Sequence, residues 1–319
     1  MGIFTKIRRH AAVAQGNFAE MFRDVTITPL PEAVSAILQE IQRPEPDTVV
    51  LERLISAEPE LSIRLLTNVN SSLYSLRSRV TCVHHAITLL GIDRVRAMVM
   101  ASAMVEAVPL PRDPLFDHKG YWADTLIRSL VARELASRHT PGREETAFTA
   151  MLLADIAVPV LLESWDEYYR PVLEDWHKRP SRLARLERER FGWEHGQAGS
   201  WILKYWNFPD ELVCLVAAHN LPPLKLRELG LEHTVAPSLV VAGLLPSCMN
   251  PSLRRCVGMV DLAEEALGIS PEQWPMIMAT VRTQFDLIHA QFDLPRGKPD
   301  RLFQSMRQVF ENDRQQLCL

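Results

Sequence analysis

In the segment AFTAMLLADIAVPVLL, residues 147–162, Asp155 is the only charged residue. Such a segment is apolar on every face of a helix, which predicts a helix buried on all sides in the middle of a helical bundle. We expect this helix to cover about residues 144–163. Pro159 should kink it, because proline has no N–H for the helical hydrogen bond and its ring clashes with the preceding turn.

Apolar residues recur at helical spacing on both sides of this segment, for example at Val34, Ile37 and Ile41. No convincing run of alternating β-branched residues predicts a strand, so we expect an all-α fold. Near the C-terminus, Ser270-Pro271-Glu272-Gln273 has the form of a helix capping box. The last predicted helix has an apolar face made of Leu302, Phe303, Met306, Val309 and Phe310.

A cluster of three prolines, Pro109, Pro111 and Pro114, marks the best internal boundary of the chain. We expect an N-terminal extension, two packed helical lobes and a C-terminal helical extension, at residues 1–26, about 27–110, about 114–250 and 251–319. The two lobes together form the main domain, 27–250. The C-terminal helices should fold back on one lobe, although the last helix could instead make a dimer contact.

Charge and cysteine content disfavour several classes of protein. The chain has 35 Lys and Arg against 39 Asp and Glu, so it lacks the bulk positive charge that supports nucleic-acid binding. Its five cysteines are odd in number and include no Cys-x-x-Cys pair, which favours reduced thiols over a disulfide framework. No apolar run approaches the roughly 20 residues of a membrane span, and the N-terminus lacks a signal peptide's apolar region. We therefore expect a cytoplasmic protein with no membrane partner.

Several short motifs follow one another along the chain: Leu30-Pro31, Glu58-Pro59-Glu60-Leu61, Asn70-Ser71-Ser72-Leu73-Tyr74, Ala86-Ile87-Thr88-Leu89-Leu90-Gly91, Trp122, the segment 147–156, Gly192-Trp193-Glu194-His195, Trp206-Asn207-Phe208-Pro209 and His219-Asn220. With these motifs, about residues 27–245 resemble the HDOD family, which are degenerate relatives of the HD and HD-GYP metal-dependent phosphohydrolases. The resemblance implies a multi-helix HDOD bundle of two lobes. The motif residues expected to be structural are Asn70, Ser71, Tyr74, Gly91, Trp122, Trp206 and Pro209. Gly91 should take the left-handed conformation that often ends a helix.

The resemblance also locates the positions that hold metal in the HD hydrolases. Those enzymes use a His, an adjacent His-Asp pair, further His residues and a late Asp, because the metal must make hydroxide from bound water. The matching positions here are Asp124, Ala154, Asp155, His195, His219, Asn220 and Gly243. Only Asp155, His195 and His219 keep the family's ligands. Loss of two or more ligands predicts a site too weak to hold the metal, so we expect no metal, no other cofactor and no catalytic residue.

Structural roles compete with metal binding at the retained positions. Asp155 in an apolar helix is expected to pair with an arginine or with hydrogen-bond donors, because a lone buried carboxylate is costly. His195 and His219 are expected to cap or bridge helices. In the alternative, these histidines bind a metal with Asp155, helped by Asp124.

Other polar and methionine clusters are also expected to be structural. His84 and His85 point about 100° apart on a helix and should not share an ion. Methionines at helical spacing, Met98, Met100 and Met104, are expected in the core rather than on a partner surface. Acidic and basic residues alternate at Arg182, Arg185, Glu187, Arg188, Glu189 and Arg190, which favours a solvated helix with ion pairs over an anion site.

These observations favour a non-catalytic bacterial signal-transduction or regulatory module. It would act on other signalling proteins by protein–protein contact, as a monomer or homodimer, and could bind a nucleotide-like small ligand in the remnant HD cavity. A second hypothesis is a weak metal-dependent phosphohydrolase that uses Asp124 and Asp155 in a rearranged site. A third is a regulator that contacts nucleic acid, which the acidic charge balance makes the least favoured.

Overall fold

The computed structural model describes residues 16–23, 31–43, 45–70, 80–109, 111–179, 181–248, 254–289, 294 and 297–311. Within these residues the chain forms helices and their connections, and no strand, so the all-α prediction is confirmed. Ser71 and Tyr74 lie outside the described residues. The first lobe contains α3 (Glu32–Ile41), α4 (Thr48–Ser56), α5 (Pro59–Val69), α6 (Val83–Leu90) and α7 (Ile92–Ala107), and is preceded by the short α2 (Phe18–Met21).

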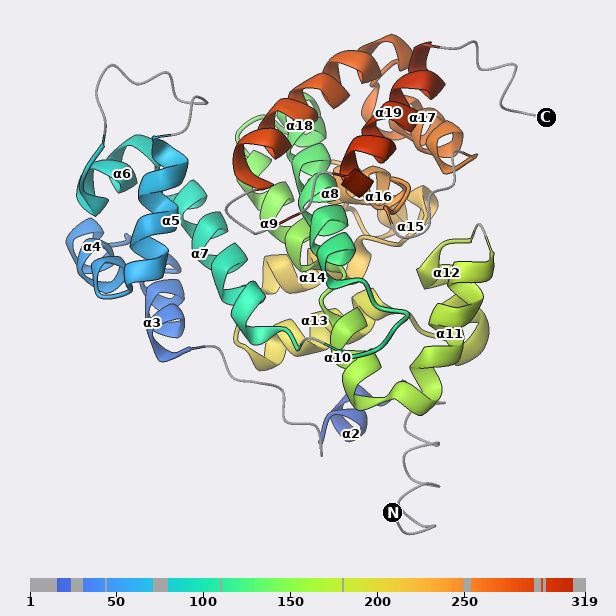
Figure 1. Cartoon of the computed structure of the whole chain (residues 1–319), viewed down its shortest axis with the longest axis horizontal. Coiled ribbons are helices and arrows are strands. Elements are labelled where there is room, and N and C mark those ends of the chain that lie inside the picture. Colours follow the sequence, from blue (N-terminus) through green and yellow to red (C-terminus); the bar gives the residue numbers. More distant parts are fainter. Residues whose placement is uncertain are drawn as a thin grey trace.

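The second lobe contains α8 (His118–His139), α9 (Glu144–Ala154), α10 (Ala157–Ser164), α11 (Asp166–Lys178), α12 (Leu183–Phe191), α13 (His195–Tyr205), α14 (Asp210–Ala218), α15 (Pro223–Glu228) and α16 (Ala236–Gly243). It is followed by α17 (Arg254–Leu267), the 3₁₀ turn η2 (Pro271–Gln273), α18 (Trp274–Ile288) and α19 (Gly297–Glu311). Figure 1 shows α3–α6 at the left end of the molecule, α8, α9, α13 and α14 near its centre, α11 and α12 at the lower right, and α17–α19 at the upper right. Helix α7 packs on both α3 and α9 and so joins the two lobes.

Helix α9 is the central helix that its sequence predicts. Every residue from Ala147 to Ala154 is buried, and α8, α7, α14 and α16 pack around it. The Glu144–Ser164 segment satisfies the length and hydropathy of a membrane span, contrary to our expectation, with a mean hydropathy of 1.7 in its most apolar window. However, 83% of that window is buried inside the molecule, so the segment is accounted for as core.

The predicted kink is a break in the helix, and it lies before the proline. Helix α9 ends at Ala154, and α10 begins at Ala157 and contains Pro159. Because Pro159 has no N–H, the carbonyl of Asp155 four residues earlier loses its helical donor. That carbonyl accepts instead from the Val158 N–H at 3.0 Å and from the Tyr121 hydroxyl at 3.2 Å. The break therefore turns the chain at Asp155 and frees its side chain from the helix surface.

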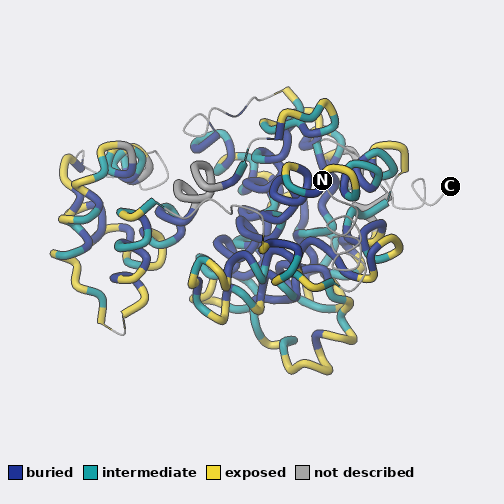
Figure 2. Tube along the Cα trace, turned by 90° about the horizontal axis from the view of Figure 1, so that it is seen from below, coloured by how far each residue is buried: buried dark blue, intermediate teal, exposed yellow. Residues whose placement is uncertain are grey.

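One cluster of buried apolar side chains extends from the first lobe to the C-terminal helices. Figure 2 shows buried residues in dark blue in both of these parts of the chain. A second, smaller cluster lies among α10–α13 and includes Met21 and Phe22 from the N-terminal segment. Phe22 stacks on Trp201 with 5.1 Å between ring centroids, and Phe18 meets Trp193 edge to face at the same distance. Part of the N-terminal extension is therefore packed on the second lobe.

The C-terminal helices fold back on α8, as one of our two expectations stated. Ser270 and Gln273 form the predicted capping box, with the Ser270 N–H donating to Gln273 Oε1 at 2.8 Å. Leu302, Phe303 and Met306 of α19 are buried within the chain. These three side chains are therefore covered by the chain's own helices. Phe310 is only partly buried and the side chain of Val309 lies outside the described set, so a dimer contact through the last helix stays a prediction.

We predict that the C-terminal extension stabilises the same core as the two lobes. Trp274 is fully buried, so Trp274→Ala should lower the free energy of unfolding by about 3–5 kcal/mol through lost burial and a residual cavity. Met276, two residues later, is 59% exposed, and Met276→Ala should change it by less than about 0.5 kcal/mol. Urea denaturation measures both. Equal effects of the two variants would contradict the packing described here.

Candidate functional site

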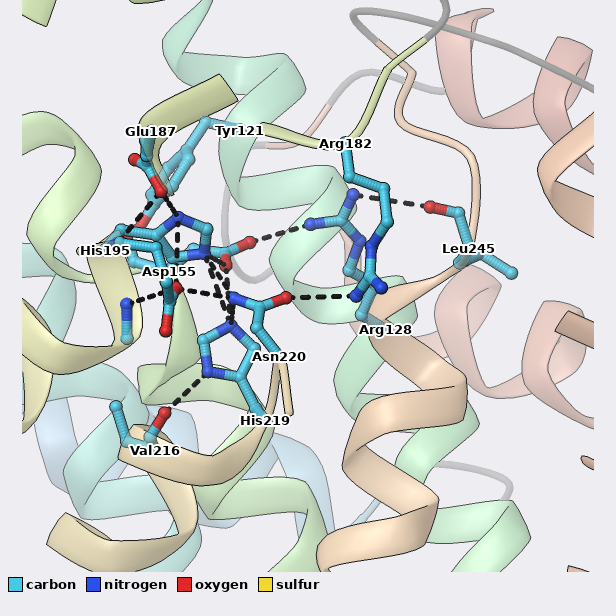
Figure 3. Close-up of polar contacts among 12 residues, drawn as sticks. Tyr121, Arg128, Asp155, Arg182, Glu187, His195, Val216, His219, Asn220 and Leu245 are labelled. Carbon is cyan, nitrogen blue, oxygen red and sulfur yellow. Dashed lines mark hydrogen bonds and ion pairs between the residues drawn. The ribbon is translucent and has the colours of Figure 1, made fainter. Parts of the chain in front are cut away.

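The ends of several helices meet in the second lobe at a single polar network. Asp155 lies at the break between α9 and α10, His195 begins α13, and His219 and Asn220 follow α14. Arg128 reaches the network from the middle of α8. Figure 3 shows these side chains directed toward one another, although they are far apart in the sequence.

The network borders a cavity of about 60 Å³. The polar part of its wall consists of Tyr121, Asp124, Arg128, Asp155, Arg182, His195, His219, Asn220 and Ser247. The remainder is largely apolar and is made of Leu115, Phe116, Val158, Leu173, Trp176, Leu183, Ala184 and Gly243. A concave site with apolar walls and a few convergent polar groups is the usual form of a small-molecule site.

The carboxylate of Asp155 joins the arginine and histidine parts of the network. Its Oδ2 accepts from Arg128 Nη1 at 2.7 Å, and its Oδ1 lies 3.1 Å from His195 Nε2 and 3.6 Å from His219 Nε2. Burial by itself would raise the Asp155 pKa, but the hydrogen bond from His195 and the charges of Arg128 and His195 outweigh it. They hold the pKa of Asp155 well below its usual range, so the group is a carboxylate.

His195 is held between two carboxylates on opposite edges of its ring. Its Nδ1 lies 2.6 Å from Glu187 Oε2, and its Nε2 faces Asp155. Burial would lower the His195 pKa, but the charge of Glu187 and the hydrogen bonds to Asp155 and Glu187 raise it well above the ordinary value. We therefore assign His195 as an imidazolium that donates from both nitrogens.

Asn220 completes the network by donating to the neighbouring histidine. His219 Nδ1 lies 2.6 Å from the Val216 carbonyl, so this nitrogen carries the proton and Nε2 has a lone pair. Asn220 Nδ2 donates to that Nε2 at 2.7 Å and to Glu194 Oε2 at 2.8 Å. The lone pair that His219 would offer to an ion is thus used by an amide proton.

Close approach of α13 and α14 permits this arrangement. A Cβ added to Gly196 would lie 2.8 Å from His219 Cε1 and 2.9 Å from the Val216 carbonyl oxygen. No side chain fits there unless α14 moves, because one of the two obstructing atoms belongs to the backbone. Sequence reasoning overlooked this glycine, which the motif Gly192–His195 directly precedes.

The other positions expected from the resemblance have varied surroundings. Asp124 lines the cavity, but its carboxylate accepts from the Ser247 hydroxyl and from the Cys248 N–H at 2.7 Å, and burial raises its pKa. Ala154 is fully buried and contributes no ligand. Gly243 also lines the cavity, where a Cβ would lie 3.7 Å from the His219 carbonyl oxygen. Asp124 is thus directed at the 247–248 segment, and Gly243 contributes no ligand.

The described motif residues lie outside the polar network and act on the backbone or the core. Asn70 Nδ2 donates to the carbonyls of Leu66 and Val80 at 2.7 Å, which closes the corner between α5 and α6. Trp122 and Trp206 pack against the core, and Pro209 precedes α14 as its N-cap. Gly91 has the expected positive φ of 78°, but its ψ of 160° lies outside the left-handed helical region.

Helix α12 corrects one of our sequence interpretations. Arg185 is exposed and pairs with Glu189 at 2.8 Å, as a solvated helix predicts. Glu187, however, is fully buried beneath His195 and accepts a hydrogen bond from the Tyr169 hydroxyl, and Arg182 lines the cavity. Glu187 lies on the same helical face as the buried Ala184 and Phe191. This spacing in the sequence was the signal that could have predicted the burial of Glu187.

Two further sequence interpretations concern side chains outside the site. His84 contacts Glu52 at 3.1 Å on the surface, and no cluster of possible metal ligands among the described residues includes it. Met100 is fully buried and Met98 packs against the core, whereas the side chain of Met104 lies outside the described set.

Comparison with known proteins agrees with this architecture. The HDOD domain family model matches residues 27–222. The chain belongs to the HDOD family. No curated protein matches it significantly.

Solved structures share the HDOD fold at low sequence identity. An HDOD domain protein of unknown function from Geobacter sulfurreducens has a TM-score of 0.65 at 18% identity, over 89% of this chain and 99% of that one. A protein from Shewanella amazonensis, provisionally assigned as a phosphohydrolase, has a TM-score of 0.63 at 20% identity, over 92% and 98%. A provisionally assigned signal-transduction protein from Marinobacter aquaeolei has a TM-score of 0.60 at 21% identity, over 95% and 67%.

The metal of the HD hydrolases can be tested against the donors present in this HDOD site. Asp155, His195 and His219 offer ligand atoms that all lie within 4.8 Å of one another. However, Arg128 holds the second oxygen of Asp155, and Asn220 donates to the free nitrogen of His219. A dication would have to displace these donors and lie beside a guanidinium that cannot lose its charge. The donor set does not fit the metal.

We predict that Gly196 is required for the close packing of α13 on α14. Gly196→Ala should lower the free energy of unfolding by about 1–3 kcal/mol, because the new methyl group overlaps His219 and the Val216 carbonyl. Gly258 lies exposed in α17 with no atom near its added Cβ, and Gly258→Ala should raise stability by about 0.5–1 kcal/mol. Thermal and urea denaturation give both values, and a neutral Gly196→Ala would contradict the packing.

A second prediction concerns pH. The His195 pKa is raised in the folded protein, so its stabilising contribution is complete below the unfolded-state pKa of about 6.5 and is lost as pH rises through the folded-state value. The urea midpoint of the wild type should therefore fall from about pH 6.5 upward more steeply than that of His195→Gln. Parallel curves for the two proteins would show that His195 is not a buried imidazolium.

Proposed function

We propose that this HDOD protein is a non-catalytic signal-transduction module that acts by contact with other proteins. The observation that carries the proposal is the donation of Asn220 Nδ2 to His219 Nε2, together with the Arg128–Asp155 ion pair. In an HD hydrolase a metal-bound water must lose a proton to become the nucleophile. Here guanidinium and imidazolium groups provide the positive charge, and neither can ionise a water as a metal does.

The same contacts support a structural function for the network. Asp155 and His195 connect the break after α9 to the start of α13, and Asn220 connects the end of α14 to Glu194, the N-cap of α13. Removing one member of a buried ion pair leaves an uncompensated charge, so the network holds these helix ends in one arrangement. A fixed arrangement of helix ends suits a module whose surface is recognised by partner proteins. The structural neighbour assigned provisionally to signal transduction is consistent with this proposal but shares only the fold.

The phosphohydrolase hypothesis has less support from the same residues. Its rearranged site needs Asp124 beside Asp155, but both oxygens of Asp124 accept hydrogen bonds from the 247–248 segment. Asp124 is also absent from the clusters of possible metal ligands among the described residues. A nucleic-acid role lacks the bulk positive charge it needs, because the net charge is −4.

Metal content tests the proposal. We expect full-length protein purified without chelator to contain clearly less than one equivalent of iron, manganese or zinc, measured by mass spectrometry. With added Mn²⁺ it should not hydrolyse bis(p-nitrophenyl) phosphate above the buffer rate, because Arg128 and Asn220 compete with the ion for Asp155 and His219. The double variant Arg128→Ala/Asn220→His removes both competing donors and adds a ligand, so it should retain more metal than the wild type.

Stoichiometric metal in the wild type that is lost in both Asp155→Ala and His219→Ala would contradict the proposal. That result would mean that the Arg128 and Asn220 contacts yield to an ion. Hydrolysis by this site would then have to be tested.

A further inference from the structure

Arg182 is a cation in the cavity wall without an acidic partner. Its Nη2 donates to the neutral Oδ1 of Asn220 at 3.1 Å, and it forms no ion pair with any residue in the described part of the chain. By contrast, Arg128 pairs with Asp155, and Arg185, three residues further along α12, pairs with Glu189. Positive charge facing the cavity is therefore only partly balanced.

The two cavity arginines lie close to each other. Figure 3 shows their side chains next to one another on the same side of the histidine network, although they come from different elements. Burial, together with the charges of Arg188 and Arg128, lowers the pKa of Arg182 to about 10, although Glu194 and Asp155 oppose this shift. Like charges held near each other in a partly buried site are stabilised when an anion lies between them.

The cavity has room for such an anion. It measures about 60 Å³. On this measure one water needs roughly 10–15 Å³, so the space suits a few waters or one tetrahedral oxyanion. Beyond the arginines, the wall is formed by Phe116, Leu173 and Trp176, which can contact a flat apolar group attached to that anion.

We propose that the cavity binds a phosphoryl group between Arg128 and Arg182, supplied either as free phosphate or by a small nucleoside monophosphate. Guanidinium groups present paired N–H donors that match phosphate oxygens. Arg128 on α8 and Arg182 just before α12 place two such groups side by side, so each can donate to different oxygens of one tetrahedral oxyanion. This inference rests on the proposed non-hydrolytic function of the same site, because Arg128 serves the anion here in place of a metal.

Binding would also connect the ligand to parts of the chain beyond the cavity. Arg128 contacts Asp155 at 2.7 Å and the carbonyl of Leu245 at 3.4 Å, at the start of the connection to α17. Arg182 immediately precedes α12, which carries Glu187 beneath His195. An anion held by both arginines therefore links α8, α12 and the connection that leads to the C-terminal helices.

Titration of the full-length protein with three probes tests the inference. Sodium phosphate, AMP and adenosine are added at constant ionic strength, with sodium chloride as reference, and binding is followed by calorimetry and by the shift in Tm. Constant ionic strength is needed because exposed charges are screened by salt. Phosphate and AMP should bind and raise Tm, whereas adenosine, which lacks the phosphoryl group, should do neither.

Variants of two arginines near the start of α12 provide the matched comparison. Arg182→Gln should weaken phosphate and AMP binding by about tenfold or more, because it removes charge-assisted hydrogen bonds to the anion. Arg185→Gln removes the same charge from an exposed position on the same helix and should leave affinity within about twofold, since surface charges contribute little. Tighter binding of AMP than of phosphate identifies a nucleotide as the source, and equal affinity identifies free phosphate.

Two results would overturn the inference. One is unchanged affinity in Arg182→Gln. The other is the absence of any response of the wild type to phosphate and AMP, which decides the question even if Arg182→Gln fails to fold. Metal content measured on the same samples separates this inference from the proposed function: absent metal with no anion binding removes only the phosphoryl site, whereas stoichiometric metal removes the proposed function.

Discussion

The ion pair between Asp155 and Arg128, shared with the imidazolium of His195, is the interaction on which the second lobe depends. It lies at the break in the most apolar segment of the chain, where a carboxylate would otherwise be buried among aliphatic side chains. Leaving a charge unpaired in such surroundings costs several kcal/mol, so the helices that supply its partners cannot move apart independently. Arg128 determines the position of α8 relative to this break, and His195 determines the position of α13.

The break itself follows from a second constraint, the missing N–H of Pro159. Without it the Asp155 carbonyl turns toward Tyr121 and Val158, and the carboxylate is released toward the cavity. In a continuous helix the side chain of residue 155 would follow the helix surface into neighbouring helices. Pro159 thus affects the orientation of the Asp155 side chain through the backbone, because its missing N–H frees the carbonyl four residues earlier.

In this site Asn220 stands at the position of an HD-hydrolase ligand, and in our proposal the arginine side chains supply the positive charge of the metal. This exchange changes what the HD architecture can do. The ligand atoms of Asp155, His195 and His219 still lie within 4.8 Å of one another, as in a possible metal centre. Asn220 uses one N–H to fill the lone pair of His219 and the other to hold Glu194. A site that once exchanged substrate and water becomes, in our proposal, a rigid junction with a basic cavity beside it.

Much of the fold follows from the sequence by itself. The all-α class, the buried central helix, the Ser270 capping box and the membership of the HDOD family depend on local patterns of residues, and such patterns need no knowledge of distant contacts. The changes at Ala154, Asn220 and Gly243 are likewise visible in the sequence, because the residue type alone decides whether a position carries the imidazole or carboxylate that the HD hydrolases use.

The partners of the retained residues were decided only by the tertiary structure. Arg128, Arg182 and Glu187 belong to helical patterns whose charged residues resemble an ordinary solvated surface, and the sequence does not state which of them faces inward. Glu187 is buried because α13 lies across it, and Arg182 lines the cavity because α12 begins at its edge. Whether a charge is solvated or paired depends on the packing of helices distant in the sequence, and that packing determines which chemistry remains possible at the site.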